Sequence, residues 1–362
     1  MSKILSLVIV GFGGMGSYHV QLIEGNQNIK VSGVYDIADE RQQAASQLGF
    51  KTYPNLEAVL QDSTVDAILI ATPNDVHKEI AIKALEAGKH VVCEKPVTIN
   101  SRDLLDIIDV AKNHDRVFMV HQNRRWDEDF VIIKDMYDHH KVGEVFHLES
   151  RVQGANGIPG DWRHLQAHGG GMVLDWGVHL LDQLLFMVKG KITSVTANLS
   201  FALGDEVDDG FISYITFENG VTAVIEVGTT NYVKLPRWYI KGTEGTALIQ
   251  DWDLSGERVN RNQSAEKSEP KPIRAGQGLT KTMAPPSESA TIRYPIEKVE
   301  TKMESFYDNF VAVIRGKSEP IVKNEEVYRV LVLIEAIFKA AETNEVVKDF
   351  DVLNHTLDQA NL

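Results

Sequence analysis

The chain has 362 residues, enough for two domains of ordinary size, and 43% of them are hydrophobic. Its formal net charge of -14 argues against a broad basic surface for nucleic acid. The single cysteine, Cys93, excludes an intrachain disulfide and a thiolate metal cluster. The apolar run at 4–10 is too short to span a membrane and lacks the cleavage site of a signal peptide, so we expect a cytoplasmic protein that acts away from membranes.

Residues 1–123 alternate short apolar runs with helical patterns. The apolar runs lack polar alternation, which is typical of a parallel sheet covered on both faces. The predicted strands are 5–10, 31–35, 67–71, 90–93 and 117–120, and the predicted helices lie near 15–24, 39–48, 75–87 and 102–114. Strand and helix alternation predicts a doubly wound α/β domain of the Rossmann type.

Residues 124–362 show a different pattern, which predicts a second domain for substrate binding and oligomerisation. Several of its strands alternate polar and apolar residues, and Asn219-Gly220 is a strong hairpin signal. We expect an open, mostly antiparallel sheet flanked by helices at about 130–139, 172–187, 302–315 and 325–341. The stretch 255–295 is rich in Ser, Pro, Lys and Glu and is predicted to form surface loops.

A glycine-rich segment with the form G-x-G-x-x-G directly follows the first predicted strand and opens a helix. Gly11 permits the tight turn, Gly13 lets a pyrophosphate approach the backbone, and Gly16 allows the helix to pack closely on the sheet. The helix amides and dipole then favour phosphate. A glycine-rich turn without a ligand is the alternative, but this context favours a dinucleotide site.

Asp36 ends the second predicted strand, where a carboxylate accepts hydrogen bonds from the adenosine ribose. A carboxylate there repels the 2′-phosphate of NADP, and Arg41 lies further on, in the next helix. The sequence therefore predicts NAD as the cofactor, with NADP disfavoured, unless Asp36 only caps a helix or turn.

The end of the third predicted strand carries polar residues that could reach the cofactor. Thr72 and Asn74 lie at the carboxyl end of that strand, where open α/β sheets bind ligands. Asn74 could instead cap the following helix, and His77, in its first turn, could be a surface residue. The predicted cofactor contacts are Gly11, Phe12, Gly13, Gly14, Met15, Gly16, Asp36, Thr72, Asn74, His77, Glu94, Lys95, Asn123, Trp162 and Arg163.

Lys95, in Glu94-Lys95-Pro96, follows another strand and would lie at the same sheet edge. Asp175 and His179 are four residues apart and would share one helix face after the glycines 169–171. Oxidation of an alcohol needs a group that takes the hydroxyl proton, and histidine can do so at neutral pH. Lys95 could stabilise the developing alkoxide, and Asp175 could orient the histidine or bind a neighbouring hydroxyl.

Each of these residues also has an ordinary structural explanation. Lysine is usually a solvated surface charge, and Asp175 with His179 could be a helix cap and a core histidine. The remaining histidines at 139–140, 164 and 168 have no ligand spacing with a carboxylate, so we expect no metal.

The order of three motifs resembles the Gfo/Idh/MocA oxidoreductase family. They are Gly11-x-Gly13-x-x-Gly16, Glu94-Lys95-Pro96, and the glycines 169–171 followed by Asp175 and His179. The segment 121–126 resembles the crossover between the two domains of that family, and Asp161-Trp162-Arg163 resembles its loop over the nicotinamide.

The resemblance implies hydride transfer at a hydroxyl of a sugar or a cyclic polyol such as inositol. It also implies that Lys95, Asp175 and His179 are the catalytic residues, and that the subunits form a homodimer or homotetramer through the second sheet. Two alternatives remain: a ligand sensor that keeps the cofactor fold, and an NAD-dependent enzyme that cleaves glycosides.

Overall fold

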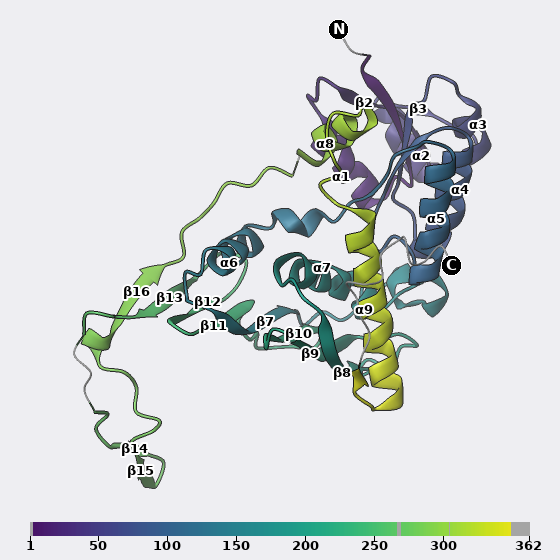
Figure 1. Cartoon of the computed structure of the whole chain (residues 1–362). Helices are drawn as coiled ribbons and strands as arrows, with labels where there is room; N and C mark the ends of the chain where they lie inside the picture. Colours follow the sequence, from purple (N-terminus) through teal and green to yellow (C-terminus); the bar gives the residue numbers. More distant parts are fainter. Residues whose placement is uncertain (1–2, 266–268, 304, 349–362) are drawn as a thin grey trace.

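Two β-sheets follow one another along the chain in the computed structural model, which describes residues 3–265, 269–303 and 305–348 (Figure 1). The first sheet has six parallel strands in the order β3-β2-β1-β4-β5-β6. They are β1 (Leu5–Val10), β2 (Ile29–Tyr35), β3 (Lys51–Thr52), β4 (Ala67–Ile70), β5 (His90–Cys93) and β6 (Phe118–Val120). Every residue of β1 and β4 is buried, as expected for strands covered on both faces. The predicted Rossmann sheet is confirmed.

Helices connect these strands and cover the sheet. They are α1 (Gly14–Ile23), α2 (Asp39–Gln47), α3 (Leu56–Gln61), α4 (His77–Glu86) and α5 (Ser101–Asn113). α5 begins where the Asn100 side chain accepts a hydrogen bond from the Asp103 amide, at 2.9 Å. The chain order reverses between β1 and β4, so the loops after these strands share the edge where such sheets bind ligands.

The second sheet has nine strands in the order β16-β13-β12-β11-β7-β10-β9-β8-β17. They are β7 (Val145–Gln153), β8 (Ile192–Ser200), β9 (Gly210–Phe217), β10 (Thr222–Gly228), β11 (Trp238–Gly242), β12 (Gly245–Ile249), β13 (Gly256–Arg261), β16 (Thr291–Pro295) and β17 (Val347–Lys348). Only β7 and β10 pair in parallel within this described sheet. Gly220 has a φ of 84° in the turn between β9 and β10, at the predicted hairpin. The mostly antiparallel sheet is confirmed.

The stretch predicted as loops, 255–295, contains strands, so that expectation was wrong. β13 and β16 extend the second sheet, and β14 (Ile273–Ala275) pairs with β15 (Gly278–Thr280) in a hairpin that projects from the body (Figure 1). Polar cross-strand pairs hold β13 to β16, including Arg293 with Glu257 at 2.6 Å. A strand held in this way lacks the apolar alternation that sequence patterns detect.

The helices of the second half cover one face of the second sheet and also reach the first. They are α6 (Glu128–Asp138), α7 (Val178–Met187), α8 (Ser305–Ile314) and α9 (Asn324–Thr343). α6, α7 and α9 lie on one side of the sheet, whereas α8 returns to α1 (Figure 1). Asp308 of α8 accepts a hydrogen bond from Asn26 at 2.9 Å. α8 contacts both halves of the chain, since the Phe306 ring lies 4.9 Å from the ring of His121 and 6.4 Å from that of Trp126. The domain boundary after residue 123 stays a prediction.

Two parts of the predicted elements cannot be compared with the fold. Residues 349–362 of the predicted second domain and residue 304 of the helix expected at 302–315 lie outside the described residues. Within the described part of the chain, none of the helices combines the length and apolarity needed to cross a bilayer.

The other face of the second sheet carries apolar side chains that no described helix covers. Ile212 and Tyr214 are 44% and 46% exposed, and their cross-strand neighbours on this face are Glu226 and Val224. Beside them, Arg151 pairs with Glu226 at 2.9 Å. A broad exposed face of apolar and paired polar side chains is typical of a subunit interface.

We propose that two copies of the chain associate through this face. Sedimentation velocity at micromolar concentration should show a dimer or a larger assembly. Ile212→Arg should shift the distribution towards monomer, because a charged side chain would lose its water on association. Ile321→Arg, at a position that is 41% exposed on another part of the surface, is the matched control and should leave the assembly unchanged. A wild-type protein that sediments as a monomer would contradict the proposal.

Candidate functional site

The glycine-rich turn joins β1 to α1 and leaves no room for side chains at two positions. Gly11 has a φ of 94°, and a Cβ there would lie 2.5 Å from the carbonyl oxygen of Ala71. A Cβ on Gly16 would lie 2.1 Å from the carbonyl oxygen of Gly11. Gly13 caps α1 without a side-chain hydrogen bond, so the amides of the first turn remain available for phosphate.

Asp36 lies beside this turn, as the sequence predicted. It is buried, and its carboxylate accepts hydrogen bonds from the amides of Phe12 at 2.6 Å and Ala38 at 2.8 Å. Arg41 was set aside on the sequence, yet its Nη1 lies 3.5 Å from Asp36 Oδ2 and its guanidinium group also lies beside Gly13. Asp36 alone would repel the 2′-phosphate of NADP. A cation at the position of Arg41 weakens that repulsion.

The residues after β4 mainly fix neighbouring loops. Asn74 is buried, and its amide donates to the Gly169 carbonyl at 2.9 Å, which ties the first sheet to the glycine segment of the second half. His77 is fully buried, with its ring nitrogens 2.9 Å from the carbonyl oxygen of Thr72 and 3.0 Å from that of Pro96. The surface interpretation of His77 was therefore wrong: both ring nitrogens face protein carbonyls, which leaves neither for a cofactor.

Glu94 lies in a buried polar cluster that the sequence did not reveal. Its Oε1 lies 2.6 Å from His19 Nε2 and 2.8 Å from His121 Nδ1, and His19 Nδ1 lies 2.5 Å from the Tyr307 hydroxyl. Burial raises the pKa of Glu94, but His121 and His19 outweigh burial and hold that pKa well below its usual range. The carboxylate is therefore ionised and accepts hydrogen bonds from both imidazoles.

The same cluster bears on the expectation that no metal binds. His19, Glu94 and His121 bring three ligand atoms within 4.8 Å of one another, which is close enough for a metal ion. Glu94 Oε1 lies at an ordinary hydrogen-bond distance from each of the two imidazoles. Burial lowers the pKa of His19, which favours a neutral imidazole that donates a hydrogen bond. Hydrogen bonding accounts for the arrangement. The only sequence signal for His19 was its place three residues after Gly16, on the buried face of α1.

Lys95 and Asp175 meet where the two halves of the chain face each other. Lys95 Nζ lies 3.0 Å from the main-chain oxygen of Asp175 and 3.4 Å from its Oδ1, and Arg163 Nε lies 3.3 Å from the same Oδ1. Burial raises the pKa of Asp175, but Lys95 and Arg163 outweigh it and the net pKa is lowered. Asp175 is thus an ionised partner of two cations.

His179 lies one turn further along, at the start of α7. It is 3% exposed, and its buried Nδ1 has no hydrogen-bond partner among the described residues. Asp175 lies on a short π-turn (Val173–Gly177) and makes no hydrogen bond to His179 in the described structure. The sequence suggested that Asp175 orients this histidine. In the structure Asp175 instead contacts Lys95.

Burial, followed by the positive charges of Lys95 and Arg124, lowers the pKa of His179 well below its ordinary value. The imidazole is neutral at pH 7 and can accept a proton. This is the protonation state that a general base requires.

Several buried polar atoms at this sheet edge lack partners within the described residues. They include Thr72 Oγ1, Asn123 Oδ1 and both amide atoms of Gln122. Because β4, β5 and β6 are adjacent and parallel, the residues that follow them lie along one edge. Unsatisfied polar groups and a glycine turn at that edge fit a bound dinucleotide. Sequence reasoning left Gln122 out of the cofactor contacts; its only signal was its place beside Asn123.

Trp162 and Arg163 occupy the loop before the glycine segment. The guanidinium carbon of Arg163 lies 4.7 Å from the centre of the Trp162 ring, and Arg163 also pairs with Asp161 at 2.7 Å. Arg163 is thus placed with Asp175, whereas contact of either residue with a nicotinamide stays a prediction.

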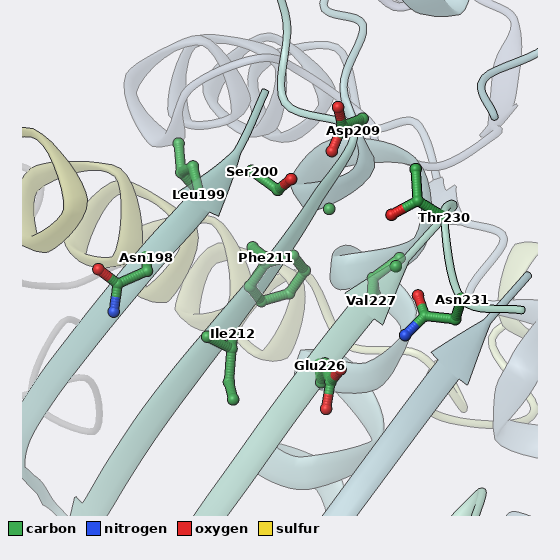
Figure 2. A pocket seen from close by; sticks show the side chains of 12 residues that line it. Asn198, Leu199, Ser200, Asp209, Phe211, Ile212, Glu226, Val227, Thr230 and Asn231 are labelled. Atoms are coloured by element: carbon green, nitrogen blue, oxygen red, sulfur yellow. The ribbon is translucent and has the colours of Figure 1, made fainter. Parts of the chain in front are cut away.

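A separate pocket lies at the ends of β8, β9 and β10. Figure 2 shows Ser200, Asp209, Thr230 and Asn231 around it, and none of its lining residues is a predicted site residue. The ring of Phe211, which also lines this pocket, packs against Gly177, where a Cβ would lie 2.8 Å from it. The pocket wall therefore supports the π-turn that carries Asp175.

The cluster around Glu94 should contribute to stability. Glu94→Gln keeps the side-chain shape but removes the charge that two imidazoles face, so we expect unfolding to need about 1–3 kcal/mol less free energy. Urea denaturation followed by tryptophan fluorescence measures this difference. Glu86→Gln, at an exposed position, is the control. Equal urea midpoints for the two variants would refute the predicted contribution.

Comparison with known proteins agrees with this architecture. The family model described as "Oxidoreductase family, NAD-binding Rossmann fold" matches residues 5–122, and the "GFO/IDH/MocA C-terminal domain" matches residues 130–248. A solved structure described as an NAD-binding protein from Listeria innocua is 67% identical, with a TM-score of 0.93 over 96% of this chain and 100% of that chain.

Relatives with named activities are more distant. Myo-inositol 2-dehydrogenase of Thermotoga maritima is 25% identical, and the match covers 60% of this chain and 66% of the relative. The 2,7-anhydro-N-acetylneuraminate hydratase of Escherichia coli is 26% identical, and the match covers 68% of each chain. Other relatives are named only as uncharacterized oxidoreductases.

Proposed function

The chain belongs to the Gfo/Idh/MocA oxidoreductase family, and on that premise we propose that it is a dehydrogenase acting between NAD(H) and a hydroxyl-bearing carbon of a sugar or cyclic polyol. The main observation that supports the proposal is the contact between Lys95 and Asp175. A cation at the nucleotide-binding edge of the first sheet contacts a carboxylate that is presented by the second half of the chain.

The proposed chemistry assigns one task to each side chain. When bound, NAD supplies the acceptor for the hydride that leaves the carbinol carbon. His179 takes the hydroxyl proton, since its imidazole is neutral. Lys95 donates a hydrogen bond to the reacting oxygen and stabilises its developing negative charge, and Asp175 holds the ammonium group in place.

The relatives support two classes of reaction on such a site. The inositol dehydrogenase supports net oxidation of a polyol, whereas the hydratase supports addition of water, a reaction without net oxidation of the substrate. We favour net oxidation because a neutral histidine beside a lysine suits removal of a hydroxyl proton.

A substrate panel distinguishes the two. Purified protein with NAD and a panel of inositols, aldoses, uronates and aldonates should form NADH with at least one member, which absorbance at 340 nm detects. Consumption of a substrate, followed by NMR, without NADH accumulation would favour the redox-neutral reaction. Absence of both with every member would contradict the proposed function.

The roles of His179 and Lys95 can be separated by substitution. His179→Ala should lower kcat by about a hundredfold to ten-thousandfold, because the hydroxyl proton loses its acceptor. Lys95→Ala should lower kcat at least as much, because the alkoxide loses its charge partner. His139→Ala, on an exposed histidine outside the site, is the control. Binding of NADH, measured by its fluorescence, should stay nearly unchanged in His179→Ala and His139→Ala. Lys95 is also a predicted cofactor contact, so Lys95→Ala is compared by kcat at saturating NAD.

The pH profile gives an independent check on the base. Because the pKa of His179 lies below 6.5, wild-type kcat/KM should stay level as the pH falls through 6.5 and decline only below it. His179→Ala should lose that acid limb. An unchanged profile, or near-normal kcat in the variant, would make Lys95 the next candidate base.

Cofactor choice rests on Asp36 and Arg41. We expect kcat/KM to be higher with NAD than with NADP, because the Asp36 carboxylate faces the ribose position. Asp36→Ser should narrow the preference by roughly tenfold, since a charged hydrogen-bonding group is lost. Arg41→Ala should widen it, because a cation beside Asp36 is removed. A wild-type preference for NADP would show that Arg41 outweighs Asp36.

A further inference from the structure

Three cationic side chains lie around His179, and each of them already has a carboxylate partner in the fold. Lys95 and Arg163 share the single carboxylate of Asp175, at 3.4 and 3.3 Å. Arg124 adds a third cation, and its charge reaches His179 strongly enough to help lower the pKa of that histidine. Arg124 is paired with Asp127 at 3.0 Å, and Glu94 adds a negative charge near His179, so net charge does not identify the ligand. The hydrogen-bonding groups that the fold leaves unused are more informative.

Arg124 is held by aromatic rings, one of which also contacts His179. Its guanidinium carbon lies 4.2 Å from the centre of the Trp176 ring and 5.6 Å from that of Trp252. The Trp176 ring in turn lies 5.8 Å from the His179 ring. A guanidinium group stacked in this way is fixed in orientation before any ligand arrives.

One edge of the Arg124 guanidinium group is left without a protein partner. Nη1 donates to Asp127 at 3.0 Å, whereas Nε is buried and has no partner among the described residues, and no described residue accepts a hydrogen bond from Nη2. Its neighbour shows the opposite arrangement: Arg125 donates through Nε and Nη2 to Asp182 and through Nη1 to Glu326. Arg125 is satisfied by the fold, and Arg124 is not.

We propose that the free Nε/Nη2 edge of Arg124 binds a carboxylate of the substrate, so that the substrate is an acidic sugar or polyol, such as a uronate or an aldonate. Two parallel N–H groups on one edge match the two oxygens of a carboxylate. The inference rests on the proposed function, because it places the oxidised hydroxyl at Lys95 and His179. Asp127, which binds Nη1 of the same guanidinium group, repels a phosphate dianion more strongly than a carboxylate monoanion.

The test uses pairs of sugars that differ only at C6, where a carboxylate replaces a hydroxymethyl group. Each ligand is titrated into the full-length protein with saturating NADH. The two pairs are D-glucose with D-glucuronate and D-galactose with D-galacturonate, and D-glucose 6-phosphate tests whether a phosphate group binds instead. Trp176 and Trp252 flank Arg124, so binding is followed by tryptophan fluorescence; kcat/KM with NAD is measured in parallel. At least one acidic member should bind about ten- to a hundredfold more tightly than its neutral partner.

Substitution of Arg124 assigns the effect to its side chain. Arg124→Gln should remove the advantage of the acidic member, and Arg124→Lys should restore only part of it, because lysine has charge but no fork. Arg258→Gln is the matched control: that arginine also stacks on an aromatic ring, Tyr294, at 4.2 Å, but lies on β13, outside the site. The control should keep the wild-type preference.

The possible outcomes separate the inference from the proposed function. Equal binding of neutral and acidic members, or an advantage that survives Arg124→Gln, would overturn the inference while leaving polyol oxidation intact. Preference for D-glucose 6-phosphate would overturn the carboxylate assignment. Tight, Arg124-dependent binding of a uronate without NADH formation would support the inference and contradict the dehydrogenase chemistry.

Discussion

The contact between Lys95 and Asp175 brings side chains from the two halves of the chain together at the proposed site. Lys95 is fixed from the first sheet, where His77 lies against the carbonyl of Pro96 next to it. Asp175 is fixed from the second half, where Asp208 accepts hydrogen bonds from the amides of Met172 and Val173 at 2.9 Å. Because both supports are buried, the position of the pair depends on packing well outside the site.

Local patterns were sufficient for the parts of the site that depend on one strand and the turn after it. The glycine turn and Asp36 follow from the requirements of a βαβ unit, since close backbone packing and a strand end fix both positions. Lys95 was predictable in the same way, from its place after β5. The second sheet was predictable from alternation and from one hairpin turn.

The remaining features depend on partners that are distant in sequence. His19 and Tyr307 are 288 residues apart, and no local pattern brings α8 back to α1. β13 and β16 are joined by paired charges and stacked rings, such as Arg258 on Tyr294, which resemble a loop composition. Arg41 belongs to a helix with little apolar character, so its guanidinium group beside Asp36 could not be inferred from spacing.

The hydrogen-bond partners of Asp175 also determine the charge of the neighbouring His179. An aspartate bonded to His179 would favour the imidazolium form and leave Lys95 with only a carbonyl contact. Bonded instead to Lys95 and Arg163, it leaves His179 among cations and without a hydrogen bond to Nδ1, so the imidazole stays neutral. Under the proposed function, Asp175 thereby positions Lys95 to donate a hydrogen bond to the developing oxyanion and leaves the neutral imidazole of His179 to accept the proton.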